Sequence, residues 1–221
     1  MYLDDIKKSI PEKLYSVLKN EGIKELRSSQ EKAIHAGLFE KKNLLISTPT
    51  ASGKTLIAEM AAVSAILNGE GKAIYIVPLK ALATEKFKDF KRKYGNLMKI
   101  AISIGDFDSD DYKLHSFDFI LTTSEKFDSL IRHKIPWINL VKVVVVDEIH
   151  LLNDADRGPT LEILLTLLKK QIPTAQIIAL SATIGNPKDL AHWLDAKLVE
   201  DKWRPIELHK GIYFDRRIEF Y

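Results

Sequence analysis

Short apolar runs alternate along the chain with longer stretches in which apolar residues recur at helical spacing. The runs are rich in β-branched residues and predict strands over residues 44–47, 73–77, 100–104, 119–122, 141–146 and 176–180. The stretches between them predict helices over residues 54–67, 79–94, 124–133 and 160–170. Strands that alternate with helices need crossover connections, so the pattern predicts an α/β fold with a central, mostly parallel sheet flanked by helices.

The run at 141–146 has almost no polar alternation and ends at two carboxylates, which is typical of a central strand buried on both faces. The alternation of strands and helices occupies residues 41–200, which we interpret as one domain. Residues 1–40 are expected to form two helices joined at Glu21-Gly22, and residues 201–221 to form extended segments that lead to a continuation. Ligands of open α/β sheets bind beyond the carboxyl ends of the strands, so the chemistry is sought there.

The segment 48–55, Thr-Pro-Thr-Ala-Ser-Gly-Lys-Thr, joins a predicted strand to a predicted helix as a phosphate-binding loop does. Its backbone N–H groups would converge on phosphate oxygens, Lys54 would reach the β- and γ-phosphates, and the Thr55 hydroxyl would coordinate Mg²⁺. Thr48 stands where the simple motif has glycine, which argues against a generic nucleotide kinase. The residues assigned to nucleotide binding in this loop are Thr48, Pro49, Thr50, Ala51, Ser52, Gly53, Lys54 and Thr55.

Two adjacent carboxylates follow the strand at 141–146. Asp147 is predicted to hold Mg²⁺ through a water molecule and Glu148 to orient and deprotonate the attacking water, the two tasks of a phosphoryl hydrolase. For His150 two interpretations remain open, a place in the γ-phosphate network or simple packing beside it. Lys54, Asp147, Glu148 and His150 are thus the catalytic candidates.

Polar residues near two other predicted elements join this set. Ser181 and Thr183 follow the strand at 176–180, and their hydroxyls are expected to bond the Asp147 and His150 side chains and so to couple the strand ends. A helix cap is the simpler interpretation of such a pair. Gln30, upstream of the phosphate loop, carries an amide suited to the paired donor and acceptor of an adenine edge.

Two further strand ends are candidates for nucleic-acid contacts. Pro78 and Lys80 open the helix at 79–94, whose start suits a backbone phosphate, while its later lysines, Lys86 among them, are interpreted as a solvated face. The second candidate group lies at the end of the strand at 119–122 and consists of Thr122, Thr123 and Ser124. Its alternative role is a capping box in which Thr122 pairs with Glu125. The acidic segment Gly105-Asp106-Phe107-Asp108 has a turn interpretation that stays open.

The bulk composition narrows the class of protein. Lys and Arg number 33 against 30 Asp and Glu, so the net charge of +3 makes any nucleic-acid contact local rather than spread over a basic surface. The absence of cysteine excludes disulfides and thiolate metal sites. No long apolar run or signal segment is present, so we expect a cytoplasmic protein that does not enter a membrane.

Read in order, the motifs at Gln30, 48–55, 78–83, 122–126, 147–150 and 181–183 resemble the motif series of superfamily 2 helicases. Finer features at 105–111, 147–154, 156–162 and 203–208 resemble the archaeal repair helicases of the Hjm type. The resemblance implies the first RecA-like domain, a P-loop NTPase, of an ATP- and Mg²⁺-dependent enzyme. It also implies 3′ to 5′ translocation along single-stranded DNA at stalled or branched forks.

Helicases of this type hydrolyse ATP between two RecA-like domains, the second of which supplies arginines. We therefore expect this chain, interpreted as a fragment, to bind ATP with weak or no hydrolysis and to need a second RecA-like domain as partner. Three alternatives stay open: a superkiller-like RNA helicase, a non-catalytic ATP-binding switch, and a recombinase-like filament former. Glu148 argues against the switch, because a sensor needs no water-activating base.

Overall fold

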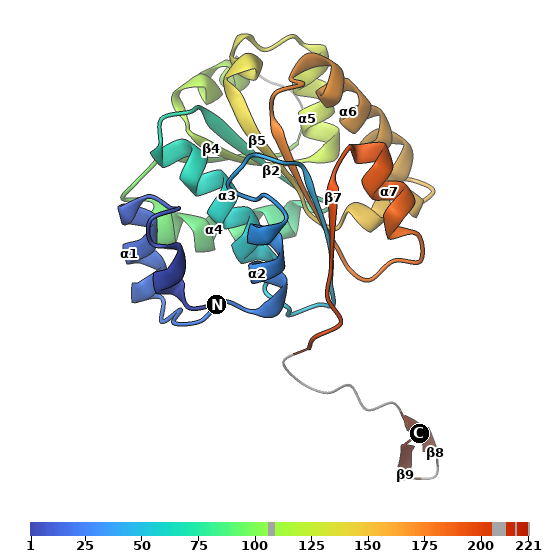
Figure 1. Ribbon diagram of the computed structural model, residues 1–221. Coiled ribbons are helices and arrows are strands. Elements are labelled where there is room, and N and C mark those ends of the chain that lie inside the picture. Colours follow the sequence, from blue (N-terminus) through green and yellow to red (C-terminus); the bar gives the residue numbers. More distant parts are fainter. Residues whose placement is uncertain (106–108, 205–210, 215, 221) are drawn as a thin grey trace.

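The computed structural model describes residues 1–105, 109–204, 211–214 and 216–220, and the described chain forms a seven-stranded sheet with helices on both faces (Figure 1). The strands of this sheet are β1 (Leu44–Ser47), β2 (Lys72–Val77), β3 (Ile100–Ser103), β4 (Phe119–Thr123), β5 (Val141–Val146), β6 (Gln176–Ser181) and β7 (Lys197–Glu200). The α-helices are α1 (Glu12–Asn20), α2 (Ser28–His35), α3 (Lys54–Leu67), α4 (Lys80–Tyr94), α5 (Ser124–Arg132), α6 (Gly158–Gln171) and α7 (Pro187–Leu194). Short 3₁₀ helices are η1 (Leu3–Ile6), η2 (Ser109–Ser116), η3 (Pro136–Leu140) and η4 (Ile149–Asn153).

The strands of the sheet run in the order β3-β4-β2-β5-β6-β1-β7, and every pair is parallel. The predicted α/β fold is therefore confirmed, with the six predicted strands found within two residues of their expected ends. The pattern missed the edge strand β7 and the helix α7. In β7 only Val199 is buried, so its apolar signal is too short to mark a strand.

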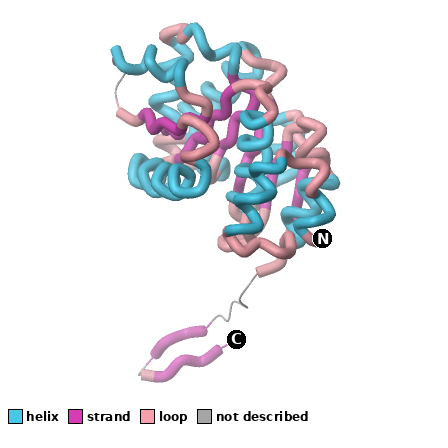
Figure 2. The backbone as a smooth tube through the Cα atoms, turned by 90° about the vertical axis from the view of Figure 1, so that its left-hand side faces the viewer, coloured by secondary structure: helices cyan, strands magenta, loops and turns pink. Residues whose placement is uncertain are grey.

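The two faces of the sheet build two separate hydrophobic clusters. Along β5, Val143 and Val145 point into the cluster under α3 and α4, whereas Val144 and Val146 point into the cluster under α5, α6 and α7. Successive side chains of a strand face opposite sides, so a strand covered on both faces must be apolar at every position. Helices cover the sheet on both faces (Figure 2), which explains the four consecutive valines at 143–146.

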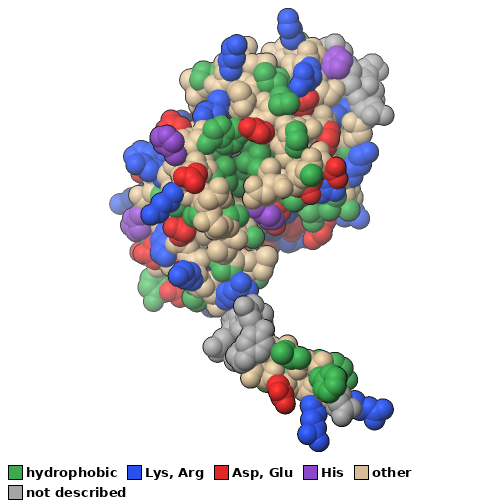
Figure 3. Space-filling view, turned by 90° about the vertical axis from the view of Figure 1, so that its right-hand side faces the viewer, with side chains coloured by type: hydrophobic (Ala, Val, Ile, Leu, Met, Phe, Trp, Pro, Cys, Tyr) green, Lys and Arg blue, Asp and Glu red, His purple; other side chains and the backbone are tan. Residues whose placement is uncertain are grey.

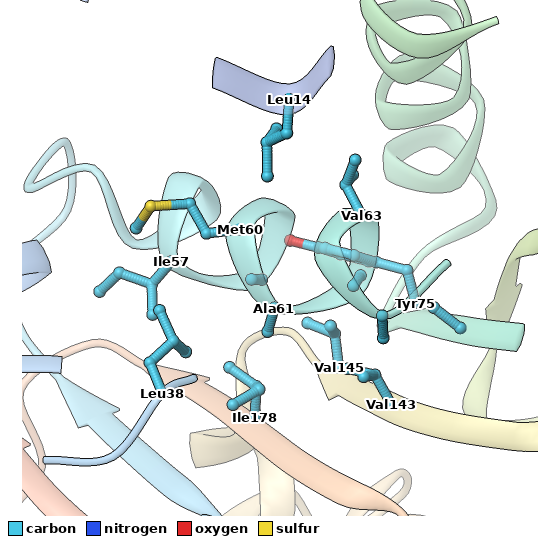
Figure 4. Packing of buried hydrophobic residues seen from close by; sticks show 14 of the residues in the cluster. Leu14, Leu38, Ile57, Met60, Ala61, Val63, Tyr75, Val143, Val145 and Ile178 are labelled. Carbon is cyan, nitrogen blue, oxygen red and sulfur yellow. The ribbon is translucent and has the colours of Figure 1, made fainter. Parts of the chain in front are cut away.

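Helix α3 is apolar on nearly all sides because it lies between two layers. Figure 4 shows Leu14 of α1 on one side of α3 and Val145 and Ile178 of the sheet on the other. Leu14 and Ala33, from α1 and α2, are fully buried in the same cluster. The N-terminal helices thus share the core of the sheet, although the boundary at residue 40 itself stays an expectation.

At the other end, β8 (Gly211–Phe214) and β9 (Arg217–Phe220) form an antiparallel hairpin whose described residues are all exposed. Figures 1 and 3 show it apart from the sheet, with apolar side chains on its surface. Residues 106–108 of the acidic segment and residues 205–208 of the extended segment lie outside the described residues. Among the residues that the structure describes, no helix is both long enough and apolar enough to cross a bilayer.

Candidate nucleotide and active site

The loop between β1 and α3 is held in a curled conformation. Ala51 and Gly53 have left-handed backbones, with φ of 61° and 90°. The hydroxyls of Thr48 and Ser52 lie 2.7 Å apart and bridge the loop. The φ of Gly53 favours glycine, and a Cβ there would come 2.5 Å from the Gln30 amide nitrogen, so the Gln30 side chain would have to shift. The loop leads into the N-terminus of the long helix α3, where backbone N–H groups without a helical partner favour an anion.

Lys54, the first residue of α3, is only 9% exposed. Its ammonium donates to two backbone carbonyls, those of Thr48 at 3.2 Å and Ser181 at 2.8 Å. Burial lowers the pKa of Lys54, and the nearby carboxylates of Glu148 and Asp147 act in the opposite direction. The amine is therefore held at the meeting point of β1, β6 and the end of β5.

Asp147 and Glu148 leave β5 at the same edge of the sheet. Asp147 accepts a hydrogen bond from the buried Tyr75 hydroxyl at 2.9 Å and a second from the Glu148 backbone N–H at 3.1 Å. Burial and the charge of Asp147 raise the pKa of Tyr75 well above its usual range, so Tyr75 stays a donor. Glu148 has a φ of 53°, a conformation unusual for this residue type that is often found at functional sites.

The two predicted magnesium ligands lie close to one another. Lys86 bridges them, because its ammonium donates to the Thr55 hydroxyl at 2.9 Å and lies 3.6 Å from Asp147 Oδ2. A hydroxyl and a carboxylate are oxygen ligands of the kind that Mg²⁺ takes beside phosphate oxygens. With the Gly53 cradle and the Lys54 amine alongside, these residues fit Mg²⁺ and a nucleoside triphosphate.

His150 lies beside Glu148, whereas the Ser181 side chain makes no hydrogen bond among the described residues. His150 Nδ1 lies 3.3 Å from Glu148 Oε2, yet within the described residues neither atom has a hydrogen-bond partner. The Ser181 hydroxyl is buried and also has no partner among the described residues, so the expected bond to Asp147 is not made. Ser181 instead uses its carbonyl, which accepts from Lys54 and from the Thr48 N–H. Thr183 lies beyond β6 and is exposed.

Gln30 is buried beside the phosphate loop rather than open to solvent. Its amide accepts from the Arg27 N–H at 2.8 Å and donates to the Gly53 carbonyl at 3.1 Å. Its adenine-reading role stays a proposal, which must use the remaining N–H and lone pair. Sequence reasoning missed Arg27, whose guanidinium donates to the Ala51 carbonyl and lies 5.5 Å from the centre of the Trp203 ring. No pattern in the sequence marks this contact.

Lys86 was wrongly interpreted as part of a solvated face. Its side chain is 23% exposed and points into the site. Helical periodicity held the signal, since Lys86 stands three residues after Ala83 and four before Phe90, both fully buried. Tyr75, the partner of Asp147, was also missed, because within a strand it resembles any core aromatic residue.

The candidate nucleic-acid residues lie at neighbouring strand ends, because β2 pairs with β4 so that Val77 faces Thr123. Lys80 is exposed at the start of α4. The side chains of Thr122, Thr123 and Ser124 are at most 5% exposed. The predicted capping box was displaced by one residue, since β4 extends through Thr123 and the Thr123 hydroxyl accepts from the Lys126 N–H. Pro78 and Ser124 line one small cavity with Asp147 and Glu148.

Comparisons with known proteins agree with this geometry. Residues 27–190 match the family described as DEAD/DEAH box helicase. The chain is 58% identical over 216 residues to the ATP-dependent DNA helicase Hel308 of Methanocaldococcus jannaschii, covering 95% of this chain and 18% of that protein. It is 53% identical to the ATP-dependent DNA helicase Hel308 of Pyrococcus horikoshii, covering 93% of this chain and 28% of that protein. The chain thus spans less than a third of the length of these relatives.

Among solved structures, the DUF1998 helicase MrfA bound to DNA and AMPPNP superposes with a TM-score of 0.75 at 26% identity, covering 88% of this chain and 29% of that one. The fold is therefore the RecA-like fold that the resemblance implied. Since the family match covers most of the chain, including the phosphate loop and both carboxylates, this protein belongs to the DEAD/DEAH box helicase family.

Proposed function

We propose that the chain is the ATP-binding motor domain of an ATP-dependent DNA helicase that moves 3′ to 5′ on single-stranded DNA and acts at stalled or branched forks in the cytoplasm. The observation that carries the proposal is the convergence of Lys54, Thr55, Asp147 and Glu148 at one edge of the sheet. These residues come from two segments, the start of α3 and the end of β5. Lys86 of α4 links Thr55 to Asp147, and both carboxylates act on the Lys54 ammonium through their charge.

Each residue has a distinct task in this proposal. Lys54 exchanges its two carbonyl partners for phosphate oxygens, which form stronger, charge-assisted hydrogen bonds. Thr55 and Asp147 hold Mg²⁺, which supplies neutralisation of the phosphate charge when bound. Glu148, whose Oε2 has no hydrogen-bond partner among the described residues, orients a water molecule and takes its proton.

The remaining assignments rest on position. Gln30 reads the adenine edge, His150 joins the γ-phosphate network, and Ser181 and Thr183 couple the strand ends to the carboxylates. The loop residues Thr48, Pro49, Thr50, Ala51, Ser52 and Gly53 supply backbone N–H groups to the phosphates. Each of these assignments can be tested by a single substitution.

DNA is the proposed partner at the ends of β2 and β4, through Pro78, Lys80, Thr122, Thr123 and Ser124. With these threonine and serine side chains buried, the contacts there would be made mainly by backbone N–H groups at the start of α5. The relatives named above as DNA helicases support DNA over RNA. A second RecA-like domain is proposed to supply the arginines that complete the ATP site.

The test is Glu148→Gln in the full-length protein. Loss of the general base should reduce DNA-stimulated ATP hydrolysis by about 10²- to 10⁴-fold while ATP binding is retained. Glu162→Gln, on the exposed side of α6, is the control and should hydrolyse ATP normally. Normal turnover by the Glu148 variant would refute the catalytic assignment, and stronger stimulation by single-stranded RNA than by DNA would favour the RNA helicase alternative.

A further inference from the structure

Lys86 occupies a position that no step of the proposed function uses. Its ammonium donates to Thr55 Oγ1 at 2.9 Å and lies 3.6 Å from Asp147 Oδ2. It also lies 5.6 Å from the centre of the Tyr75 ring, whose hydroxyl donates to the same Asp147 oxygen. A flexible lysine is thus held in one place by a hydroxyl, a carboxylate and an aromatic face.

Lys86, and not the motif lysine Lys54, supplies the positive charge beside Asp147. The phosphate-loop motif would make Lys54 the expected cation beside Asp147. Its ammonium instead donates to the carbonyls of Thr48 and Ser181. Asp147 is largely buried, with a side chain 13% exposed, and a buried carboxylate without a cation is costly. Lys86 is therefore the ion-pair partner of Asp147 among the described residues.

We infer that Lys86 is a positioning residue that holds the magnesium place: its ammonium lies between the two proposed metal ligands and must leave when a divalent cation enters. This inference rests on the proposed assignment of Thr55 and Asp147 as metal ligands. An ammonium and a divalent cation repel each other, and the Thr55 hydroxyl oxygen and the Asp147 carboxylate oxygen cannot serve both fully. Until a divalent cation binds, Lys86 would keep these two oxygens together and balance the charge of Asp147.

The two ends of α4, the helix that carries Lys86, are held differently. At its far end α4 is fixed to α3, because Lys93 lies 3.2 Å from the buried Glu59 carboxylate and the Tyr94 hydroxyl donates to Glu59 at 2.6 Å. Its near end begins at the exposed Lys80, beside the proposed DNA contact. Metal entry would thus remove the Lys86 contact between the site and the half of α4 that begins beside the proposed DNA contact, while the Glu59 contacts would still hold the other half to α3.

The experiment measures Mn²⁺ binding to the chain without nucleotide, from the loss of the free Mn²⁺ signal in electron paramagnetic resonance. Lys86→Met keeps the length of the side chain and removes its charge. Because a charge-assisted competitor is lost, Mn²⁺ should bind about tenfold more tightly or better than to the unchanged protein. Lys88→Met, at an exposed position on the same helix, is the matched control and should bind Mn²⁺ as the unchanged protein does.

The sign of the change separates this role from a merely structural one, since damage to the site would weaken Mn²⁺ binding. Equal or weaker binding by Lys86→Met would overturn the inference, as would equal tightening by Lys88→Met. Should the methionine variant not fold, Lys86→Gln is judged by the same criterion. Asp147→Asn tests the metal site itself: if it leaves Mn²⁺ binding intact, the proposed ligand set fails, and the inference falls with it.

Discussion

The connections that leave β1 and β4 end at the same edge of the sheet, yet they use their polar groups in opposite ways. Residues 48–53 separate β1 from α3, and the left-handed backbones of Ala51 and Gly53 curl this loop. In contrast, α5 begins directly after Thr123, the last residue of β4, and the Thr123 hydroxyl is used by the backbone of its own helix. The extra chain length after β1 thus shapes a loop suited to an anion, whereas the start of α5 carries a side-chain cap on one of its N–H groups.

The largest effect should come from Lys54→Met in the first connection. Loss of the ammonium should weaken ATP binding by about a hundredfold, because charge-assisted hydrogen bonds to the phosphates are lost. Binding of a fluorescent ATP analogue measures it. Lys80→Met is the matched control, since Lys80 is likewise the first residue of the helix that follows its strand, and it should leave ATP affinity unchanged. An equal loss of ATP affinity in both variants would mean that the connection after β1 does not bind ATP differently from the connection after β2.

A smaller effect is expected from Gly53→Ala, which tests the curl of the loop. The added Cβ would meet the Gln30 amide at 2.5 Å on a backbone of φ 90°, which should lower the free energy of unfolding by about 2 kcal/mol. Chemical denaturation measures this loss, and ATP affinity should fall with it. Gly185→Ala is the control, because a Cβ there meets nothing within 4 Å. An unchanged Gly53→Ala protein would contradict the proposed need for the left-handed conformation.

The smallest effect should come from Thr123→Ala in the second connection. Removal of the cap should lower the free energy of unfolding by about 1 kcal/mol and leave ATP affinity unchanged. Thr123→Ser keeps the accepting oxygen and should restore most of the stability in the same denaturation experiment. If the serine variant is as unstable as the alanine variant, the Thr123 methyl group rather than its cap carries the stability.

The elements with strong periodicity were predicted well. The helix over 54–67 and the strand over 141–146 were found with the expected ends, because both are buried on all sides and carry a long apolar signal. The predictions failed where the apolar pattern was short or where an element's end was set by its pairing with another strand. Strand β7 was missed because one buried valine does not make a pattern, and the cap on α5 was displaced because the end of β4 is set by its pairing with β2.

The candidate site divides in the same way. The phosphate loop and the adjacent carboxylates were visible because each combines a fixed spacing with a strand before it. Lys86 was not, because its role depends on which face of α4 turns inward, and Arg27 was not, because its contact crosses from the N-terminal segment to the loop. Helical periodicity can place Lys86 on the inward face of α4, but no local pattern shows which side chains from other segments it meets there.

The sequence by itself determined the alternation of strands and helices, the loop at 48–55 and the carboxylates at 147–148, since each is a local pattern with a local physical cause. Only the tertiary structure decided which charges meet. It placed the ammonium of Lys54 on two carbonyls and that of Lys86 between Thr55 and Asp147. The reason is that strand order and helix packing bring these groups within a few ångströms, and electrostatic pairing acts only over such distances.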